Sequence, residues 1–545
     1  MIKSAGDGAR TRGKPVVKRF LALAVVVALL APGIGQALAA TPRDVLVMAK
    51  RIDDIITLDP AEIFEFSGAE YAANVYDRLI TYDLRDVSRL EGGVAESWTV
   101  SEDGRTFTFT IRQGMTFHSG NPVTADDAAW SLQRVIRLNK SPAFILAQFG
   151  FTPENVAERI RATDAYTLVI ETEEAYAPTF LLYCLSAGVG SVVDRRLVEA
   201  QERDGDMGHG WLRTHSAGSG PFKLSLWRPS EILSLERHDD YWRGAPAMRR
   251  VLIRHIAETA TQRLLLEGGD IDIARNLSPD QIASLEGRAG LRIRRVPKVD
   301  IYYLALNQKN PELSRPEVRR ALKYLVDYQG IQDTILRGKV VVHQSFLPTG
   351  FLGAIEDRPY GLDVAYAREL LAEAGLADGF AITMDTPSTS PILEVAQVIQ
   401  ATFAKAGIAL ELIPGSGKQT LTKYRARNHD IYIGRWGADY PDPHANAAAF
   451  ASNPDNADDA RIKSLAWRNS WEIPELTAMT QAAVRERDDA RRAGLYQAIQ
   501  RLHLADSPFV IMFQDIELVV ERTNVHGLVL GPNFETNFYR TVTKD

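Results

Sequence analysis

The sequence predicts an α/β protein built of two lobes that are joined by two crossing strands. Segments with the period-two alternation of half-buried strands alternate with segments of helical periodicity along most of the chain. Two apolar stretches without alternation, residues 301–306 and 508–513, have the composition of strands buried on both faces. They bracket a region with its own α/β pattern, which is the layout of an inserted lobe with a hinge. The chain has 545 residues, too many for one hydrophobic core, so two or three domains are expected.

The clearest strand signal lies at residues 106–112, where polar and apolar side chains alternate. Asp103 and Gly104 directly before it form a hairpin-turn pair, and Trp98 and Val100 mark the preceding strand. The same period of two returns at residues 166–170, 380–384 and 408–412. Each of these segments is predicted to be a strand.

Helices are predicted between the strands, and their starts are marked by capping residues. Thr124 with Asp127, and Ser314 with Glu317, have the three-residue spacing of a capping box. Asp363 is predicted to begin a further helix with inward-facing leucines.

The first forty residues have the pattern of an export signal. A basic front end precedes an apolar run at residues 20–30, which is too short to span a bilayer because a span takes about 20 apolar residues. Ala37 and Ala39 then form a small-x-small pattern, so cleavage is expected after Ala39 or Ala40. Losing six basic residues and one acid changes the formal net charge from −6 to about −11. An acidic chain without basic clusters is a poor candidate for binding nucleic acid or anionic membranes.

Cys184 is the only cysteine, so an intrachain disulfide is excluded. A bacterial lipoprotein needs a cysteine directly after its signal, and none stands there. We therefore expect a freely diffusing protein in the periplasm of a Gram-negative cell.

The usual enzyme motifs are missing from the sequence. No Gly-x-Ser-x-Gly elbow occurs, no two histidines are four residues apart, and one cysteine cannot form a thiolate metal site. Gly415 to Lys418 looks like the tail of a phosphate loop, but Gln419 follows where Ser or Thr is required. We expect a protein that is not an enzyme and carries no cofactor and no metal.

Several short segments, in their order and spacing, together carry a resemblance to a known family. They are LDP at 58–60, NVYDRL at 74–79, AESW at 95–98, FHSG at 117–120, GSGPF at 218–222, DYWRG at 240–244 and PEVRRAL at 316–322. With them the chain resembles the family 5 extracellular solute-binding proteins of ABC importers, the oligopeptide- and dipeptide-binding type, over nearly all of its mature length.

The resemblance implies a periplasmic binding protein type II-like fold of two lobes with an extra inserted domain and two crossing hinge strands. Domain I would be discontinuous and would comprise residues 41–83, 217–300 and 509–545. Domain II would be the insert at residues 84–216, and domain III would comprise residues 301–508. In this family the lobes close over the ligand, and the protein, expected to be a monomer, delivers it to the transmembrane subunits of a permease.

The resemblance also implies which residues bind the ligand. Asp439, within the segment RWGADYP at 435–441, matches an aspartate that pairs with the ligand's α-ammonium group. The alternative is that Asp439 only opens the turn before Pro441. Trp436 would line the cleft or, alternatively, be a core residue. Arg435 would meet a ligand carboxylate or point to solvent.

Further residues are expected at the edges of the cleft. Glu65 and Phe66 match the early cleft-edge segment of the family, and Phe144 matches an aromatic residue on the rim of domain II. Tyr302 and Tyr303 begin the first hinge strand, where alternation lets only one face the cleft, and Tyr303 is favoured.

The implied function is capture of a short peptide, or a peptide-like solute, for import. The alternatives are a non-peptide solute such as an opine, a sugar or a metal chelate, and, less favoured, a periplasmic peptidase or a chaperone-like binder. Asp442 and His444 lie near the implied site and leave the solute open, although a histidine in a surface turn is the favoured interpretation of His444.

Overall fold

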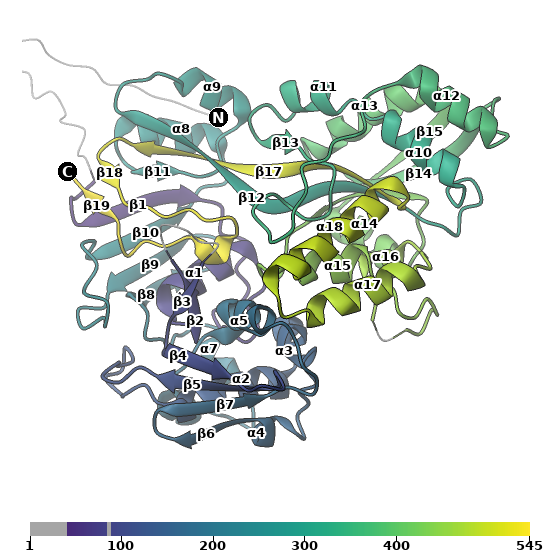
Figure 1. Ribbon diagram of the computed structural model, residues 1–545. Coiled ribbons are helices and arrows are strands. Elements are labelled where there is room, and N and C mark those ends of the chain that lie inside the picture. Colours follow the sequence, from purple (N-terminus) through teal and green to yellow (C-terminus); the bar gives the residue numbers. More distant parts are fainter. Residues whose placement is uncertain (1–40, 84–88, 461) are drawn as a thin grey trace, which may run out of the picture.

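The computed structural model describes residues 41–83, 89–460 and 462–545. The expected export signal and its cleavage point at Ala39 or Ala40, and the expected start of domain II at residues 84–88, lie outside the described residues. The described chain is a mixed α/β structure whose main sheet runs through both lobes (Figure 1). This confirms the predicted fold class.

The main sheet has eleven strands and mixed polarity. β1 is parallel to both of its neighbours, and β14 is parallel to both of its neighbours. In spatial order the strands are β15 (Ile408–Gly415), β14 (Phe380–Pro387), β16 (Ile431–Trp436), β12 (Leu291–Leu306), β17 (Phe509–Arg522), β11 (Ile273–Ala274), β1 (Val45–Lys50), β10 (Arg250–His255), β9 (Ile232–Arg237) and β8 (Phe222–Arg228), with β13 (Val340–Val342) beside β17.

Strands β12 and β17 are the two crossing strands that the sequence predicts. They have 16 and 14 residues and pair antiparallel along nearly their whole length. The first half of β12 lies with the first lobe, and its second half pairs with β16 of the second lobe. The register shifts between Pro297 and Ile301, where proline has no N–H to give to the ladder. This shift lies between the part of β12 that belongs to the first lobe and the part that pairs with β16.

The first lobe packs apolar residues on both faces of its part of the sheet, in two clusters. Its other elements are α1 (Phe66–Val75), β2 (Ile80–Tyr82), β3 (Leu90–Gly92), α8 (Thr259–Gly268), α9 (Pro279–Leu285), β18 (Val525–His526), η3 (Phe534–Thr536) and β19 (Thr543–Lys544).

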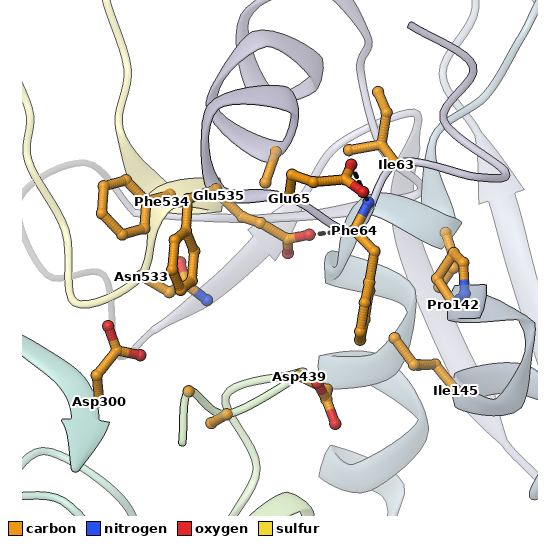
Figure 2. A pocket seen from close by; sticks show the side chains of 16 residues that line it. Ile63, Phe64, Glu65, Pro142, Ile145, Asp300, Asp439, Asn533, Phe534 and Glu535 are labelled. Atoms are coloured by element: carbon orange, nitrogen blue, oxygen red, sulfur yellow. Dashed lines mark hydrogen bonds between the residues drawn. The ribbon is translucent and has the colours of Figure 1, made fainter. Parts of the chain in front are cut away.

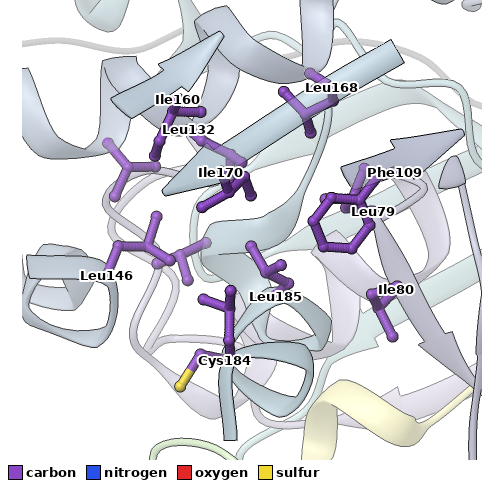
Figure 3. Packing of buried hydrophobic residues seen from close by; sticks show 14 of the residues in the cluster. Leu79, Ile80, Phe109, Leu132, Leu146, Ile160, Leu168, Ile170, Cys184 and Leu185 are labelled. Atoms are coloured by element: carbon purple, nitrogen blue, oxygen red, sulfur yellow. The ribbon is translucent and has the colours of Figure 1, made fainter. Parts of the chain in front are cut away.

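The predicted insert has its own sheet, in the order β4-β5-β7-β6, and its own core (Figure 3). Cys184 is buried in this core as a free thiol. Thr124 and Asp127 form the predicted capping box of α2. The elements are β4 (Ala95–Val100), β5 (Thr106–Ile111), α2 (Ala125–Leu138), η1 (Ser141–Ala143), α3 (Phe144–Ala147), α4 (Val156–Arg159), β6 (Ile160–Asp164), β7 (Thr167–Glu171), α5 (Pro178–Ser186), η2 (Gly188–Gly190), α6 (Arg195–Glu199) and α7 (His209–Leu212).

The second lobe surrounds its half of the main sheet with helices. Asp363 caps α12 as predicted, but Ser314 does not cap α10: Arg315 is the N-cap residue, and the Ser314 hydroxyl donates to the carbonyl of Pro311 at 2.8 Å. The helices are α10 (Pro316–Tyr324), α11 (Tyr328–Asp333), α12 (Val364–Glu373), α13 (Ile392–Lys405), α14 (Gly417–Arg425), α15 (Pro443–Phe450), α16 (Leu465–Arg468), α17 (Pro474–Arg485) and α18 (Asp489–Ala505).

Among the described residues, no helix is both long enough and apolar enough to cross a membrane. The exact boundaries of the three domains stay a prediction.

Candidate functional site

A cavity of 210 Å³ lies where the two lobes and the insert meet (Figure 2). The start of α1, helices η1 and α3, helix η2, the turn after β16 and the C-terminal segment around η3 all contribute to its walls. The lining residues are Ile63, Phe64, Glu65, Phe66, Ala69, Pro142, Ile145, Gly188, Val189, Asp300, Gly437, Ala438, Asp439, Asn533, Phe534 and Glu535. None of these residues is a lysine, arginine or histidine.

Asp439 reaches this cavity from the turn that follows β16. Gly437 lets that turn pass against the crossing strand β12, because a β-carbon there would lie 2.4 Å from an Asp300 oxygen. Across residues 41–83, 89–460 and 462–545, the Asp439 carboxylate has no hydrogen bond and no ion pair. Burial, reinforced by the nearby carboxylate of Glu535, raises the pKa of Asp439 to about 7. A cation entering the cavity would meet an unpaired carboxylate.

Glu535 and Glu65 add two further carboxylates to the same cavity. One oxygen of Glu535 accepts the Gly188 N–H at 2.9 Å, while the other is buried without a hydrogen-bond partner and lies 3.7 Å from Arg78. Burial raises the pKa of Glu535 and also that of Glu65. Carboxylates with raised pKa values in an enclosed space favour a ligand group that carries positive charge.

Aromatic rings form much of the apolar wall. Phe66 and Phe534 lie 4.8 Å apart, centroid to centroid, and the ammonium of Lys298 lies 4.7 Å from the centre of Phe534. Phe64 lines the cavity and packs edge-on against Phe144 at 6.2 Å. Such walls exclude water and accept varied side chains, while the low dielectric strengthens an ion pair inside.

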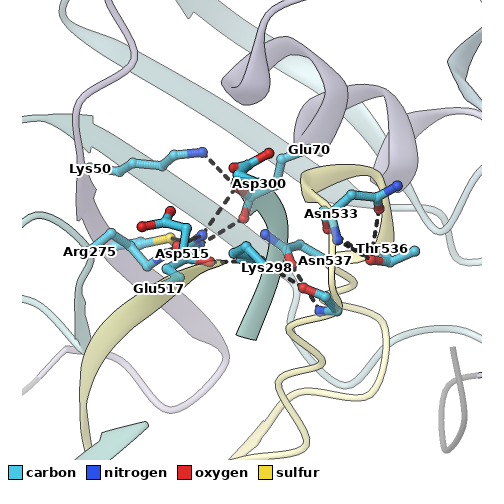
Figure 4. Close-up of polar contacts among 12 residues, drawn as sticks. Lys50, Glu70, Arg275, Lys298, Asp300, Asp515, Glu517, Asn533, Thr536 and Asn537 are labelled. Carbon is cyan, nitrogen blue, oxygen red and sulfur yellow. Dashed lines mark hydrogen bonds and ion pairs between the residues drawn. The ribbon is translucent and has the colours of Figure 1, made fainter. Parts of the chain in front are cut away.

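A buried ionic network holds the first-lobe side of the cavity in place (Figure 4). Lys298 on β12 donates to the Gly531 carbonyl at 2.7 Å and pairs with Glu517 on β17 at 2.8 Å. Arg275 joins Glu517 to Glu70 of α1. Burial opposes the charge on Glu517, but Arg275 and Lys298 outweigh it and lower its pKa to about 2. The segment that carries Glu535 is therefore fixed to both crossing strands.

A second, larger cavity of 950 Å³ adjoins the first, and Phe66 and Phe534 line both. Its walls come from the first lobe, including Arg51 and Asn276, and from the second lobe, including Lys339. Together the two cavities form the interlobe cleft.

The structure brings Asp439, Glu65 and Phe66 together in the small cavity. Phe144 does not line this cavity but packs against Phe64, which does. Trp436 lines neither cavity. It packs edge-on against Phe450 at 6.0 Å and donates its indole N–H to Asn446 at 3.0 Å.

Arg435 lines the larger cavity, but its charge is already matched. The guanidinium pairs with Asp300 and, at 2.7 Å, with Asp515, and its position over Tyr302 and Phe66 adds ring contacts. Burial opposes the charge on Arg435, but Asp300 and Asp515 outweigh it and raise the pKa of Arg435 further. The sequence predicts that Arg435 meets a ligand carboxylate or points to solvent. In the structure its guanidinium is not free for a ligand carboxylate, because two aspartates already pair with it.

The two tyrosines are placed opposite to the expectation. Tyr302 lines the larger cavity, whereas Tyr303 is 2% exposed and packs among Phe450, Phe509 and Tyr432. The register explains this, because Tyr303 pairs with Gly434, where a β-carbon would crowd its ring at 3.1 Å. The favoured residue is therefore corrected from Tyr303 to Tyr302.

Asp442 and His444 are structural in this arrangement. Asp442 is fully buried, caps α15 through the His444 N–H and forms two hydrogen bonds of 2.7 and 2.8 Å with Arg492. The His444 ring packs on Phe180, and burial lowers its pKa to about 4. The interpretation of His444 as a surface-turn residue is corrected, since its ring is enclosed between the insert and the second lobe.

Glu535, Phe534 and Phe64 were not predicted from the sequence. Glu535 and Phe534 belong to the C-terminal segment, which has no local pattern that marks a binding site, and the fold alone brings it to the cavity. Phe64 stands beside the predicted Glu65 and is 46% exposed, so an aromatic residue before a helix was the only available signal.

Comparison with known proteins identifies the family. Residues 89–458 match the model of the bacterial extracellular solute-binding proteins, family 5 (middle region). The chain is 28% identical to the probable D,D-dipeptide-binding periplasmic protein DdpA of Escherichia coli K12, covering 94% of this chain and 96% of that protein. It is 26% identical to a dipeptide-binding protein of Pseudomonas aeruginosa, covering 88% and 92%.

Solved structures agree in fold. The periplasmic binding protein DppA from Helicobacter pylori, in complex with the peptide STSA, superposes with a TM-score of 0.75 at 24% identity over 92% of this chain and 98% of that one. A dipeptide-binding protein from Pseudoalteromonas, in complex with Met-Leu, gives 0.77 at 20% identity over 92% and 100%. With a family model that matches most of its length and two lobes around an interlobe cleft, the chain belongs to the family 5 bacterial extracellular solute-binding proteins.

Proposed function

We propose that this protein captures a short peptide between its lobes, with the peptide's α-ammonium group bound by Asp439. The observation that carries the proposal is the unpaired Asp439 carboxylate in a cavity whose lining holds four acidic residues and no basic one. A short peptide presents one charged amine at a fixed place whatever its side chains are. The ion pair fixes that end, and the aromatic walls tolerate the variation beyond it.

The relatives whose names specify dipeptides support a peptide as the ligand. We further propose that the protein is exported by cleavage near Ala39 or Ala40, works as a monomer in the periplasm and delivers its ligand to the membrane subunits of an ABC importer. It would perform no chemistry on the ligand, because the cleft side chains form no nucleophile–base pair.

Calorimetric titration with trialanine and its N-acetylated form tests the assignment. The wild-type protein is expected to bind the free amine about 10- to 100-fold more tightly, since charge-assisted hydrogen bonds contribute about 1.5–3 kcal/mol each. Asp439→Asn should remove that preference and bind both forms weakly. Asp378→Asn is the matched control, because it replaces an exposed aspartate that is distant from Asp439 in the sequence. This variant should bind both peptides as the wild-type protein does.

Equal binding of the free and acetylated peptides by the wild-type protein would overturn the ammonium assignment. Opines, sugars and nickel–histidine belong in the same panel. Saturable binding of one of these compounds, without binding of any peptide, would show that the ligand is a solute other than a peptide.

A further inference from the structure

A further hollow lies on the second lobe and is separate from the interlobe cleft. It has a volume of 740 Å³ and is bounded by α10, by α18 and by the segment at residues 357–360. None of its lining residues lines either cavity of the cleft. Its volume falls within the range of about 300–1,000 Å³ that is common for sites that hold a small molecule.

Three arginines line this hollow, and each comes from a different segment. Arg320 on α10 and Arg358 before α12 form no ion pair and no side-chain hydrogen bond with any described residue. Arg501 on α18 pairs with Asp357 at 3.4 Å, but both side chains are exposed, and exposed pairs of this kind contribute little. Among the described lining residues Asp357 is the only acidic one. The hollow therefore carries unmatched positive charge in a chain whose formal net charge is −6.

A buried lysine stands behind the wall of the hollow. Lys323 on α10 is 2% exposed, donates to the Leu504 carbonyl at 2.8 Å and lies 5.3 Å from the centre of the Tyr360 ring. Leu504 and Tyr360 both line the hollow. No carboxylate within the described ranges forms an ion pair with this ammonium, and burial lowers its pKa to about 7, although Asp506 opposes the shift. A buried cation without a counter-charge is costly, and an anion in the hollow would offset that cost.

The aromatic part of the wall is held in place by hydrogen bonds. The rings of Tyr324 and Tyr360 pack edge-on at 5.2 Å, and the Tyr360 hydroxyl donates to the Leu504 carbonyl at 2.7 Å. Gln344 binds the backbone N–H and the backbone carbonyl of Tyr360 at 3.0 and 2.8 Å. These bonds fix the segment that carries Arg358. Guanidinium groups bind carboxylate and phosphate oxygens in pairs, and tyrosine rings pack well against a carbon skeleton.

We propose that this hollow is a second binding site, for a small organic anion that carries two or more carboxylate or phosphate groups. Arg320 and Arg358 bind the anionic oxygens, and Arg501 exchanges its exposed pair with Asp357 for a further contact. A ligand with a single negative charge would leave part of the basic lining unmatched, so a polyanion is favoured. The inference goes beyond the proposed function, because the anion binds to the second lobe alone and needs no peptide in the cleft.

Titration calorimetry of the wild-type protein with citrate, pyrophosphate and acetate, at constant pH and ionic strength, tests the proposal. Citrate or pyrophosphate should bind at one site at least about tenfold more tightly than acetate, because each further charge-assisted contact adds affinity. Arg320→Met and Arg358→Met should each weaken that binding about tenfold, and the double variant should abolish it. Arg368→Met, which removes an exposed arginine of α12 outside the hollow, is the matched control and should bind as the wild-type protein does.

The failure of both polyanions to bind the wild-type protein would overturn the inference, whether or not any variant folds. Unchanged polyanion binding by the double variant would overturn the assignment to this hollow. Vesicles of phosphatidylglycerol and of phosphatidylcholine form a further arm. Binding to the phosphatidylglycerol vesicles alone, with no binding of either soluble polyanion, would show that the site meets a membrane surface and would overturn the small-molecule ligand. Trialanine affinity should be the same in all these variants, so a failure here leaves the proposed function standing.

Discussion

The surroundings of Asp439 disfavour the charged form of its carboxylate unless a cation is bound beside it. Burial and Glu535 raise its pKa to about 7, so near neutral pH the free protein holds this group partly protonated. In the folded state this pKa lies above the unfolded value of about 3.9. Its contribution to stability is therefore fully present below about pH 4 and is lost as the pH rises through 7. A bound ammonium group removes the penalty by favouring the charged form.

Peptide affinity is predicted to rise from pH 5.5 to about 7.5 as Asp439 loses its proton, and to fall above about pH 8 as the peptide amine loses its own. Glu65 and Glu535 face the same cavity with raised pKa values and add to the rise. Titration calorimetry in buffers of different ionisation enthalpy should detect proton release at pH 6. A variant Asp439→Asn with an unchanged pH profile would contradict the assignment.

At the scale of single residues, the sequence predicted some of the residues that line the small cavity but not Glu535. Asp439, Glu65 and Phe66 lie in conspicuous segments close to turns or helix starts, and they line the small cavity. Glu535 is 96 residues beyond Asp439 and reaches it only through the fold. The choice between Tyr302 and Tyr303 depends on register against β16, which alternation along one strand cannot fix.

At the scale of elements, the turn between β16 and α15 positions Asp439, and a buried ion pair holds that turn. Asp442 begins α15, and Arg492 on α18 binds it with two hydrogen bonds, with both side chains fully buried. Burial opposes the charge on Arg492, but Coulomb attraction to Asp442 outweighs it and raises the pKa of Arg492, so the guanidinium stays charged. The turn cannot move without leaving one of these charges unpaired.

Asp442→Ala is predicted to lower the free energy of unfolding by about 3–5 kcal/mol, because it leaves Arg492 buried without a counter-charge. Urea unfolding followed by tryptophan fluorescence measures the loss. Asp44→Ala, which breaks an exposed pair with Arg249, should change the free energy of unfolding far less. Equal small losses from both variants would show that the buried pair does not hold the turn.

Local patterns predicted elements well where the signal was self-contained. The alternating strand β5 and the capping boxes or caps at Thr124 and Asp363 are present. Ser314 was wrong as a capping residue because the helix begins later, at Pro316, which suits the first turn. Strand β12 was found only in its second half, since its first half carries arginines at exposed or half-exposed positions.

At the scale of the whole molecule, the insert touches the second lobe across the mouth of the cleft. The Ala177 N–H donates to the Val484 carbonyl at 3.0 Å, and Glu174 accepts from Arg485 at 2.9 Å. Phe180 of the insert packs against Tyr440 of the Asp439 turn at 5.8 Å. These contacts join the insert to the second lobe, so we expect their strength to bias the equilibrium between open and closed states of the cleft.

Arg485→Glu is predicted to weaken peptide affinity about two- to fivefold by placing like charges across the closing edge, without touching the ligand. The paired exchange Glu174→Arg with Arg485→Glu should restore it. Dissociation rates from stopped-flow fluorescence measure the effect. A paired exchange that stays as weak as the single variant would show that this contact does not take part in closure.

The sequence predicted two lobes and two crossing strands, but not that one sheet runs through both lobes. Apolar runs reveal buried strands, whereas which strands become neighbours depends on pairings hundreds of residues apart. β1 and β10 show this, since Val45 pairs with Arg250.

The most direct test is a crystal structure of the protein with a saturating free tripeptide. The account predicts the peptide in the interlobe cleft, with its amine within about 3.2 Å of the Asp439 carboxylate. A peptide bound outside the cleft, or bound in it with its amine turned away from Asp439, would contradict the account.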